Sequence, residues 1–359
     1  MAVPSRKTAV FIPALVASVL ALSACVPSSN GTPAASGSSS EKSTTVRVVV
    51  HDSFQISDEQ KASFKASSGY DLQIVTNGDG GALVNKLILT KDSPLGDLAF
   101  GVDNTFASRG LAQDVFAPYT SKAQGELGKS LRIGSDDTLT AVDYGDVCLN
   151  IDSKYYETVD LVEPLSKDGF FNPAHAGAAV VTNPATSSPG LAFLLATISK
   201  YGEDGYLDYW KQLKANGLKI VDGWEDAYYV DFSANGDGER TVALSYASSP
   251  AFTVTDDGSK STTKALLDTC FRQVEYAGVL EGAQNPEGAQ AFIDFLLSDE
   301  FQNTIPDAMY MYPVSETAVL PEAWANFAPV PDTTNSLDAE LIANNRDQWI
   351  KDWSAAIIG

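Results

Sequence analysis

The sequence predicts an α/β protein with two domains, from the order of its elements, from the repetition of that order and from its length. Near the start, the β-branched run at 46–50 reads as a strand, 58–66 as a short amphipathic helix and 71–76 as a second strand. A second strand-and-helix pattern begins at 178. Strand, helix, strand order favours a parallel sheet with right-handed crossovers. The chain has 359 residues, and the roughly 315 residues that follow its leader suffice for two hydrophobic cores.

The leader is the first 25 residues. Arg6 and Lys7 form a short basic head, and an apolar run at 9–22 follows it. This run is too short for a stable membrane span and is typical of a signal peptide. It ends in Leu22-Ser23-Ala24-Cys25, which resembles the bacterial lipoprotein cleavage box, so we expect lipidation of Cys25. The alternative is ordinary secretion with a chance cysteine.

A flexible tether is expected at 26–43. The segment consists mainly of Ser, Gly, Ala, Pro and Thr, and it has too little apolar bulk to offset the entropy of ordering it. A lipid anchor and a polar tether together predict a globular domain held at the outer face of a membrane. Later in the sequence, no run is long and apolar enough to cross a membrane.

The charge balance excludes some partners. Of the 24 basic residues, 22 remain when the leader that contains Arg6 and Lys7 is removed, against 46 acidic ones, which gives a net charge of about −24. Such an acidic chain is a poor partner for nucleic acid or anionic lipid. It is compatible with a cationic ligand, although acidic surfaces also serve solubility.

Further elements follow in order. Apolar or alternating segments predict strands at 97–101, 138–151, 178–182, 218–221, 241–245 and 269–280. Helical spacing predicts helices after 81, after 188, at 204–216, after 285 and at 337–358, with a turn or short helix at 298–305. Ser188 is expected to be the N-cap of the second of these, because Pro189 suits the first helical position.

Two loops before helices could bind a ligand. Asn77-Gly78-Asp79-Gly80-Gly81 places glycines where backbone N–H groups can approach a ligand closely, and Ser187 and Ser188 add hydroxyls to a helix N-terminus. The second loop would suit a phosphate or a carboxylate. Each loop has a purely structural alternative, a strand-to-helix turn in the first case and helix capping in the second.

The segment at 222–252 gives the strongest indication of a ligand-binding site. Trp224 lies among Asp222, Glu225 and Asp226, and the strand at 241–245 leads into Tyr246-Ala247-Ser248-Ser249-Pro250. Flat aromatic rings beside carboxylates suit a flat, cationic ligand, and loops at strand ends are common ligand sites. The alternative is that these aromatic residues belong to the hydrophobic core.

These features together resemble a known family. The matching segments are His51-Asp52-Ser53-Phe54, Asp79-Gly80, Gly101-Val102-Asp103-Asn104, Thr186 to Leu191, Gly223 to Tyr228, Ser245 to Ala251, Phe301 to Pro306 and Met311 to Val314. In this order they resemble the substrate-binding proteins of thiamine ABC transporters, which have the two-lobed type II fold of periplasmic binding proteins. The resemblance covers nearly the whole chain after the tether.

The resemblance implies an architecture and a ligand. One lobe would comprise 44–145 and 275–359 and the other 146–274, in mixed sheets joined by two hinge crossover strands, with the ligand trapped between them. The ligand-binding residues that it implies are Asp79, Gly80, Ser187, Ser188, Trp224, Tyr246, Ala247, Ser248, Ser249 and Pro250, to which we add His51, Asp52 and Tyr310. His51 and Tyr310 stand where better-known members of the family carry Tyr and Trp.

The resemblance also implies partners and a disulfide. The partners would be thiamine or its phosphates, an ABC permease and, through the lipid, a membrane; we expect a monomer without a cofactor or catalytic activity. With Cys25 lipidated, Cys148 and Cys270 remain in an exported chain, where cysteines usually pair. Both fall in the extended segments that the fold uses as hinge strands, so we expect a disulfide between them.

A ferric-ion or other cationic-solute binder of the same fold is the main alternative. Ferric binders use paired tyrosines with a histidine and an acid, and His51, Tyr310 and Tyr312 could serve. Two tyrosines two apart in a strand would share one face, but no third ligand is evident beside them. A hydrolase is disfavoured, since the chain has two histidines and no nucleophile motif around His175. A purely structural lipoprotein would not need the ligand loops.

Overall fold

One mixed sheet organises the part of the chain that the computed structural model describes, which comprises residues 43–134, 137–159, 161, 163 and 172–359. Within these residues the sheet has nine strands in the order β2-β1-β3-β8-β4-β7-β5-β6, with β9 paired to β4. The strands are β1 (Thr45–Val50), β2 (Asp71–Thr76), β3 (Leu98–Asp103), β4 (Thr140–Asp152), β5 (Ala179–Thr182), β6 (Lys219–Val221), β7 (Val242–Tyr246), β8 (Thr263–Val279) and β9 (Tyr312–Pro313). The predicted leader with Cys25 and the predicted tether at 26–43 lie outside the described residues, apart from residue 43.

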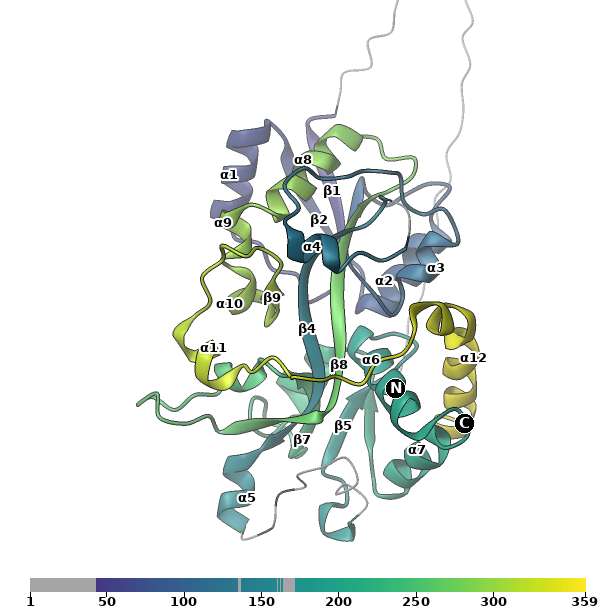
Figure 1. Ribbon diagram of the computed structural model, residues 1–359, viewed down its shortest axis with the longest axis vertical. Helices are drawn as coiled ribbons and strands as arrows, with labels where there is room; N and C mark the ends of the chain where they lie inside the picture. Colours follow the sequence, from purple (N-terminus) through teal and green to yellow (C-terminus); the bar gives the residue numbers. More distant parts are fainter. Residues whose placement is uncertain (1–42, 135–136, 160, 162, 164–171) are drawn as a thin grey trace, which may run out of the picture. The chain divides into compact units, whose positions relative to one another are not determined.

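The sheet combines two parallel parts with an antiparallel centre. β1 pairs with β2 and β3 in parallel, and β5 pairs with β6 and β7 in parallel. Between these parts, β4 and β8 pair antiparallel with each other, with β7 and β3 as their outer partners. Figure 1 shows β4 and β8 side by side, running from the part with β1 and β2 to the part with β5 and β7.

Helices connect the strands along the chain. Their bounds are α1 (Asp58–Ser68), α2 (Gly80–Leu89), α3 (Ala107–Leu111), α4 (Glu126–Ser130), α5 (Ser153–Val159), α6 (Ser188–Tyr201), α7 (Tyr206–Ala215), α8 (Pro286–Leu296), α9 (Asp299–Gln302), α10 (Ile305–Met309), α11 (Glu322–Phe327) and α12 (Ala339–Ile357). Short turns of other helix types are η2 (Pro173–His175), η3 (Asp226–Asp231), which is π-helical, and η4 (Ser249–Phe252). None of the helices among the described residues combines the length and apolarity of a membrane span.

Local sequence explains where several helices begin and end. α1 begins with a capping box, in which the Ser57 hydroxyl accepts from the Gln60 amide and the Gln60 side chain accepts from the Ser57 amide. It ends at Gly69, whose φ of 81° is a conformation that glycine adopts without strain. Asn285 caps α8, with Pro286 at the first helical position, as the sequence predicts.

Two sequence predictions are wrong in detail. The N-cap of α6 is Ser187 and not Ser188, because the Ser187 hydroxyl accepts from the Gly190 amide and leaves Pro189 in the first turn. The strand predicted at 269–280 begins earlier, at Thr263, because Thr263 to Leu266 pair with β4 beyond a shift in register. This early part has little alternation of its own, and its extended conformation depends on pairing with its partner strand.

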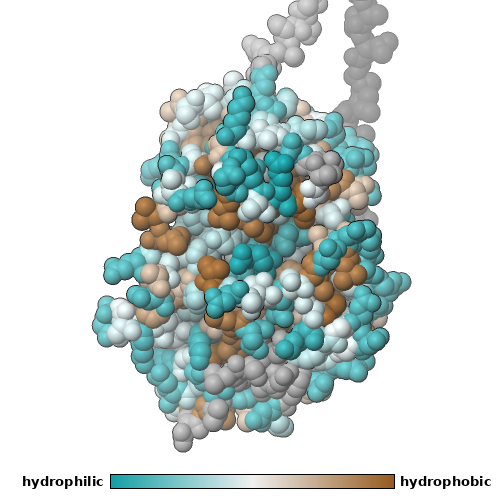
Figure 2. Space-filling view, in the orientation of Figure 1, coloured by the Kyte–Doolittle hydropathy of each residue, from teal (hydrophilic) through white to brown (hydrophobic). Residues whose placement is uncertain are grey.

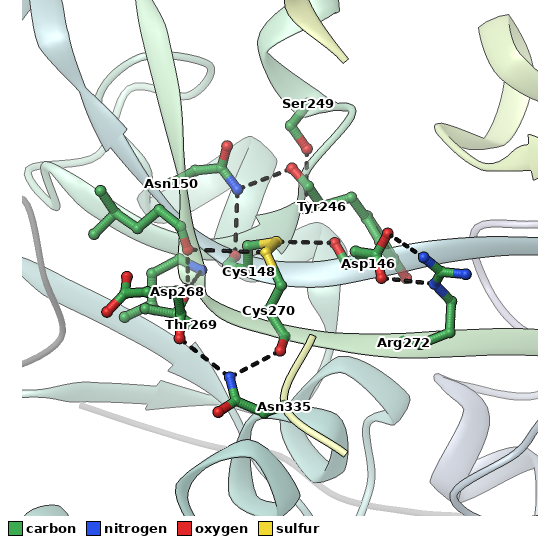
Figure 3. The surroundings of a disulfide bond; sticks show 12 residues. Asp146, Cys148, Asn150, Tyr246, Ser249, Asp268, Thr269, Cys270, Arg272 and Asn335 are labelled. Carbon is green, nitrogen blue, oxygen red and sulfur yellow. Dashed lines mark hydrogen bonds and ion pairs between the residues drawn. A yellow bond between two sulfur atoms is a disulfide. The ribbon is translucent and has the colours of Figure 1, made fainter. Parts of the chain in front are cut away.

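A disulfide joins the two long strands. Cys148 of β4 and Cys270 of β8 are bonded, with Cα atoms 4.3 Å apart and a sequence separation of 122. Figure 3 shows Arg272 and Asp146 on the same two strands beside the bridge, where Arg272 donates two hydrogen bonds of 2.6 and 3.0 Å to the Asp146 carboxylate. The two strands are therefore held together by a covalent bond and an ion pair as well as by their backbones.

The C-terminal helix contacts elements from separate parts of the chain. The Trp353 ring of α12 meets the Trp210 ring of α7 edge-on, with centroids 5.3 Å apart. Arg346, also on α12, is buried and donates to the Ser108 hydroxyl and the Thr105 carbonyl beside α3. The face shown in Figure 2 is mostly hydrophilic, with apolar side chains in separate groups.

Candidate functional site

Two adjoining cavities lie where β1, α2, α6 and β8 meet. The inner cavity has a free volume of about 20 Å³ and is lined by residues that include His51, Asp79, Ser188 and Trp224. The outer cavity has about 260 Å³, and it shares Ser53, Asp79 and Trp224 with the inner one. The inner space holds roughly one water molecule, while the outer space approaches the volume of small-ligand pockets.

Asp79 is the central polar residue of both cavities. As the N-cap of α2, its carboxylate accepts from the Gly80 amide at 2.6 Å. The same carboxylate accepts from the Ser188 amide at 3.2 Å and from the Trp224 amide at 3.0 Å. Burial raises the pKa of Asp79, although the hydrogen bonds from the Gly80 and Trp224 amides oppose the shift. Asp79 therefore connects the starts of two helices and the tryptophan loop, three segments far apart in the sequence.

Ser187 and Ser188 both have protein partners for their hydroxyls. Ser187, which is fully buried, donates to the Thr182 hydroxyl at 2.8 Å. Ser188 donates to the Asp103 carboxylate, and its amide is bound by Asp79. The anion seat that the sequence predicts at the start of α6 is thus occupied by the carboxylate of Asp79. Of the two serines, Ser188 lines the inner cavity.

Trp224 belongs to a cluster of aromatic rings and lines both cavities. Its indole N–H donates to the Ser245 hydroxyl at 2.9 Å, and its ring stacks on Tyr228 with centroids 5.2 Å apart and planes 13° apart. Tyr310 meets it edge-on at 5.6 Å. Trp224 therefore packs in the hydrophobic core and also forms part of the cavity wall. The two interpretations from the sequence, a core residue and a ligand-binding residue, are compatible for this side chain.

The loop at Tyr246 to Pro250 contributes unequally. Tyr246 lines the inner cavity, where its hydroxyl lies 3.3 Å from the Gln273 amide nitrogen. Ala247 packs against the disulfide, and Ser249 bonds to the Ser245 hydroxyl. Ser248 donates to the Tyr310 carbonyl. Pro250 lines a separate apolar pocket, with Leu267 and Phe327. In this structure the loop positions one cavity residue, Tyr246, and supports it with the others.

His51, Asp52 and Tyr310 lie at three different depths. His51 is buried in the inner cavity, where its Nε2 lies 3.4 Å from the Glu275 carboxylate. Burial is the largest single effect and lowers the pKa of His51, but the charge and hydrogen bond of Glu275, together with the charges of Asp79 and Asp52, outweigh it, and the net shift is upward. Asp52 is exposed and lines the outer cavity. Tyr310 is in a left-handed conformation after α10, with φ 62°, and reaches the cavities only through its contact with Trp224.

Six residues that line the inner cavity are absent from the predicted ligand-binding set: Ser53, Pro189, Gln273, Glu275, Met309 and Met311. Glu275 and Gln273 belong to β8, and Glu275 opposes Asp143 of β4. Burial, followed by the Glu275 charge, raises the pKa of Asp143 well above its usual value. The signal available in the sequence was that Gln273 and Glu275 are polar and stand two residues apart in a predicted strand that is otherwise mostly apolar.

The buried groups around the inner cavity carry an excess of acid. Asp103, Asp143 and Glu275 are nearly inaccessible to solvent, Asp79 is partly buried, and His51 is the buried base beside them. Burial raises the pKa of Asp103 to about 6, against the opposing effect of its hydrogen bonds from Ser188 and Thr105. Such an arrangement stabilises a cation placed among these groups.

The residues proposed for a ferric site are held apart by their contacts. Tyr312 donates to the Ala328 carbonyl and stacks on Tyr144 with centroids 5.4 Å apart. Tyr310 stacks on Phe252 and accepts from the Tyr229 hydroxyl. The expectation that Tyr310 and Tyr312 share one strand face is wrong, because Tyr310 ends α10 and precedes β9. Among the described residues, no group of three or more His, Cys, Asp or Glu has a metal-binding arrangement.

Comparison with known proteins gives consistent matches. The family of bacterial extracellular solute-binding proteins matches residues 93–334. The thiamine-binding periplasmic protein of Salmonella typhimurium is 29% identical over 298 residues, covering 83% of this chain and 87% of the relative. That of Brucella suis is 28% identical over 324 residues, covering 87% and 92%.

Solved structures agree with these matches. A periplasmic thiamin binding protein superposes with a TM-score of 0.74 at 27% identity, covering 87% of this chain and 96% of the other. The periplasmic binding protein AfuA from Actinobacillus pleuropneumoniae, bound to fructose-6-phosphate, gives 0.72 at 17% identity, covering 88% and 99%. The second likeness shows the fold alone. The fold is the two-lobed α/β fold of periplasmic binding proteins, as the sequence predicts.

Proposed function

We propose a function on the premise that this chain belongs to the family of bacterial extracellular solute-binding proteins: it captures thiamine or a thiamine phosphate between two lobes and delivers it to an ABC permease. The observation that carries the proposal is the inner cavity, where the rings of Trp224 and Tyr246 form part of the wall and the buried charged groups are mainly acids. The relatives named thiamine-binding periplasmic proteins support the same ligand.

The chemistry of thiamine matches that cavity. Thiamine joins a flat aminopyrimidine to a thiazolium cation, which carries a hydroxyethyl arm. Trp224 and Tyr246 offer ring faces or edges to the flat parts, and each cation–π contact contributes about 0.5–2 kcal/mol, depending on desolvation. Asp79 and Glu275 supply the negative charge that a buried cation needs. The arrangement binds and encloses a solute, and we propose no reaction for it.

We further propose how the chain is placed in the cell. Cys25 carries a lipid, 26–43 form the tether, and the binding domain works as a monomer outside the cytoplasm. One lobe comprises 44–145 and 275–359, and the other comprises 146–274. The sheet supports these boundaries, because β4 and β8 connect its two parallel parts. The contact of Trp353 with Trp210 means that α12, assigned by sequence to the first lobe, also packs on the second.

Fluorescence of the chain tests the proposal. Trp224 lines both cavities, so thiamine is expected to quench its emission, and Trp224→Ala should weaken thiamine binding at least tenfold, about 1.4 kcal/mol. Trp224→Phe should abolish the quench while the chain stays folded. Trp349→Phe, on α12, serves as the matched control and should leave the quench intact. A quench that survives Trp224→Phe would contradict the proposed site.

A further inference from the structure

Two polar side chains, Gln273 and Glu275, form the floor of the inner cavity, and Asp143 lies behind them. Gln273 and Glu275 stand two residues apart on β8, so their side chains share one face of the sheet, and both line the cavity. Asp143 lies opposite Glu275 on β4, with the two residues in register. The floor is thus built on the two central strands, which the disulfide and the backbone pairing hold in place.

The floor has hydrogen-bonding capacity that the protein does not use. The Gln273 amide nitrogen donates to Glu275 at 3.0 Å and lies 3.3 Å from the Tyr246 hydroxyl. Its carbonyl oxygen is buried and meets no donor among the described residues. A buried polar atom left unpaired costs about 1–3 kcal/mol. A bound molecule that supplies donors would recover this cost.

The orientation of the Gln273 amide follows from its neighbour. Its nitrogen faces the Glu275 carboxylate, and a reversed amide would place two acceptor oxygens together. The Gln273 carbonyl is therefore available as an acceptor, and Glu275 offers a second one beside it. A floor that presents acceptors prefers a ligand group with N–H donors and disfavours a carbonyl.

Thiamine has one group that fits this floor. The amino group of its pyrimidine carries two N–H donors, whereas the thiazolium carries none. Trp224 and Tyr246 line the same cavity, so a pyrimidine whose amino edge meets the floor has aromatic rings beside it. Entry of the ring requires the walls to move, since about 20 Å³ is free in this structure. Met309 and Met311 are flexible side chains that line this space and can give way.

We propose that Gln273 and Glu275 form the subsite that recognises the amino group of the ligand's pyrimidine, with Asp143 as a positioning residue for Glu275. The inference rests on the proposed function and adds the specificity of one subsite to it. Gln273 Oε1 and the Glu275 carboxylate each accept a hydrogen bond from one N–H of the amino group. Asp143 holds Glu275 from the adjacent strand and does not line the cavity itself.

The test compares thiamine with two analogues by calorimetry. Oxythiamine replaces the amino group with a carbonyl, and the deaminated analogue replaces it with hydrogen. A site built to bond a donor rejects an analogue that lacks it, so the wild-type chain should bind both analogues at least tenfold more weakly than thiamine. This measurement needs no variant. Equal affinity for thiamine and both analogues would overturn the subsite.

Variants locate the preference within the floor. Gln273→Leu and Glu275→Gln should reduce the preference for thiamine over oxythiamine to about threefold or less, and Asp143→Asn should reduce it in the same direction. Trp224→Phe is the matched control, since a weaker ring contact should affect both ligands by the same factor. Thermal melting verifies that each variant is folded.

The outcomes separate this inference from the function on which it rests. If the wild-type chain binds no thiamine, the proposed function fails and the subsite fails with it. If thiamine binds and the folded variants Gln273→Leu and Glu275→Gln keep the full preference over oxythiamine, the subsite is wrong and the proposed function stands. If a variant does not fold, the analogue measurements on the wild-type chain decide.

Discussion

Asp103 is a single buried carboxylate that makes the stability of the fold depend on pH. It is inaccessible to solvent, and it accepts hydrogen bonds from the Thr105 amide and hydroxyl and from the Ser188 hydroxyl. Burial is the main reason why its pKa rises from 3.8 to about 6, and the Glu275 charge adds to the shift. The folded chain therefore holds a proton on Asp103 at pH values where the unfolded chain has released it.

The sign of the pH dependence follows from this. Because the pKa is higher in the folded state, Asp103 destabilises the fold above pH 6, and this cost is relieved as the pH falls from about 6 towards 4. Asp103→Asn removes the ionisation. The free energy of unfolding of the wild-type chain, relative to this variant, should rise by about 2.5 kcal/mol between pH 8 and pH 4. Urea denaturation at both pH values measures the difference, and a constant difference would contradict the assignment.

Ser187 and Ser188 lead to a prediction about phosphate. Each hydroxyl already has a protein partner, and Asp79 occupies the start of α6. If this arrangement persists when ligand binds, Ser187→Ala should weaken thiamine and thiamine phosphate by the same factor, because its effect acts through the helix cap. Calorimetry with both ligands decides the matter. A loss at least tenfold larger for thiamine phosphate would show that the cap binds the phosphate.

Sequence reasoning found some cavity residues and missed others for identifiable reasons. Asp79 and Trp224 could be predicted because glycines and acids mark their loops. Gln273 and Glu275 could not, because polar residues at alternate positions of a strand usually face solvent. That these two side chains are buried follows only from the tertiary packing, in which both line the inner cavity. The N-cap of α6 was predicted one residue too late because Ser187 and Ser188 are both serines, a residue type that is favoured at the N-cap.

At the scale of elements, the pair of β4 and β8 is the most constrained part of the fold. The strands carry the disulfide, the ion pair between Arg272 and Asp146 and the floor residues of the inner cavity. The existence of both strands could be predicted from their extended patterns. The early start of β8 could not be, because Thr263 to Leu266 are extended only through their pairing with β4.

Removal of the disulfide should separate stability from binding. The bridge closes a loop across 122 residues of sequence separation, and the chain-entropy account assigns such a loop about 4–5 kcal/mol. Cys148→Ser should therefore lower the melting temperature while thiamine affinity changes by less than threefold, because β4 and β8 stay paired by their backbones. Thermal melting and calorimetry on the same sample measure both. An unchanged melting temperature, or a large loss of affinity with the fold intact, would contradict this role.

At the scale of the whole molecule, the contacts around α2 close the space between the two proposed lobes. The Ala82 amide donates to the Thr186 carbonyl at 2.9 Å, and the Asp79 carboxylate accepts from the Ser188 and Trp224 amides. Gly81 lies against the same backbone. A Cβ on Gly81 would come within 2.8 Å of the Thr186 carbonyl carbon and 2.7 Å of the Phe106 ring.

Gly81→Ala should therefore hinder closure. We expect the variant to fold and to bind thiamine at least tenfold more weakly, mainly through faster dissociation, because the closed contact needs a glycine at this position. Gly125→Ala is the matched control, since its Cβ would have its nearest neighbour 3.9 Å away. Stopped-flow fluorescence measures the dissociation rates. Equal rates for Gly81→Ala and the wild-type chain would show that this contact does not close the site.

Titration calorimetry of the purified chain with thiamine tests the central claim most directly. The acidic, aromatic cavity predicts a dissociation constant of about 1 µM or lower for thiamine, with one site per chain and no measurable heat from ferric citrate. A negative heat-capacity change is expected as well, because the ligand's rings become buried. If thiamine gives no heat while ferric citrate or another cation binds at one site per chain, thiamine capture is the wrong function for this cavity.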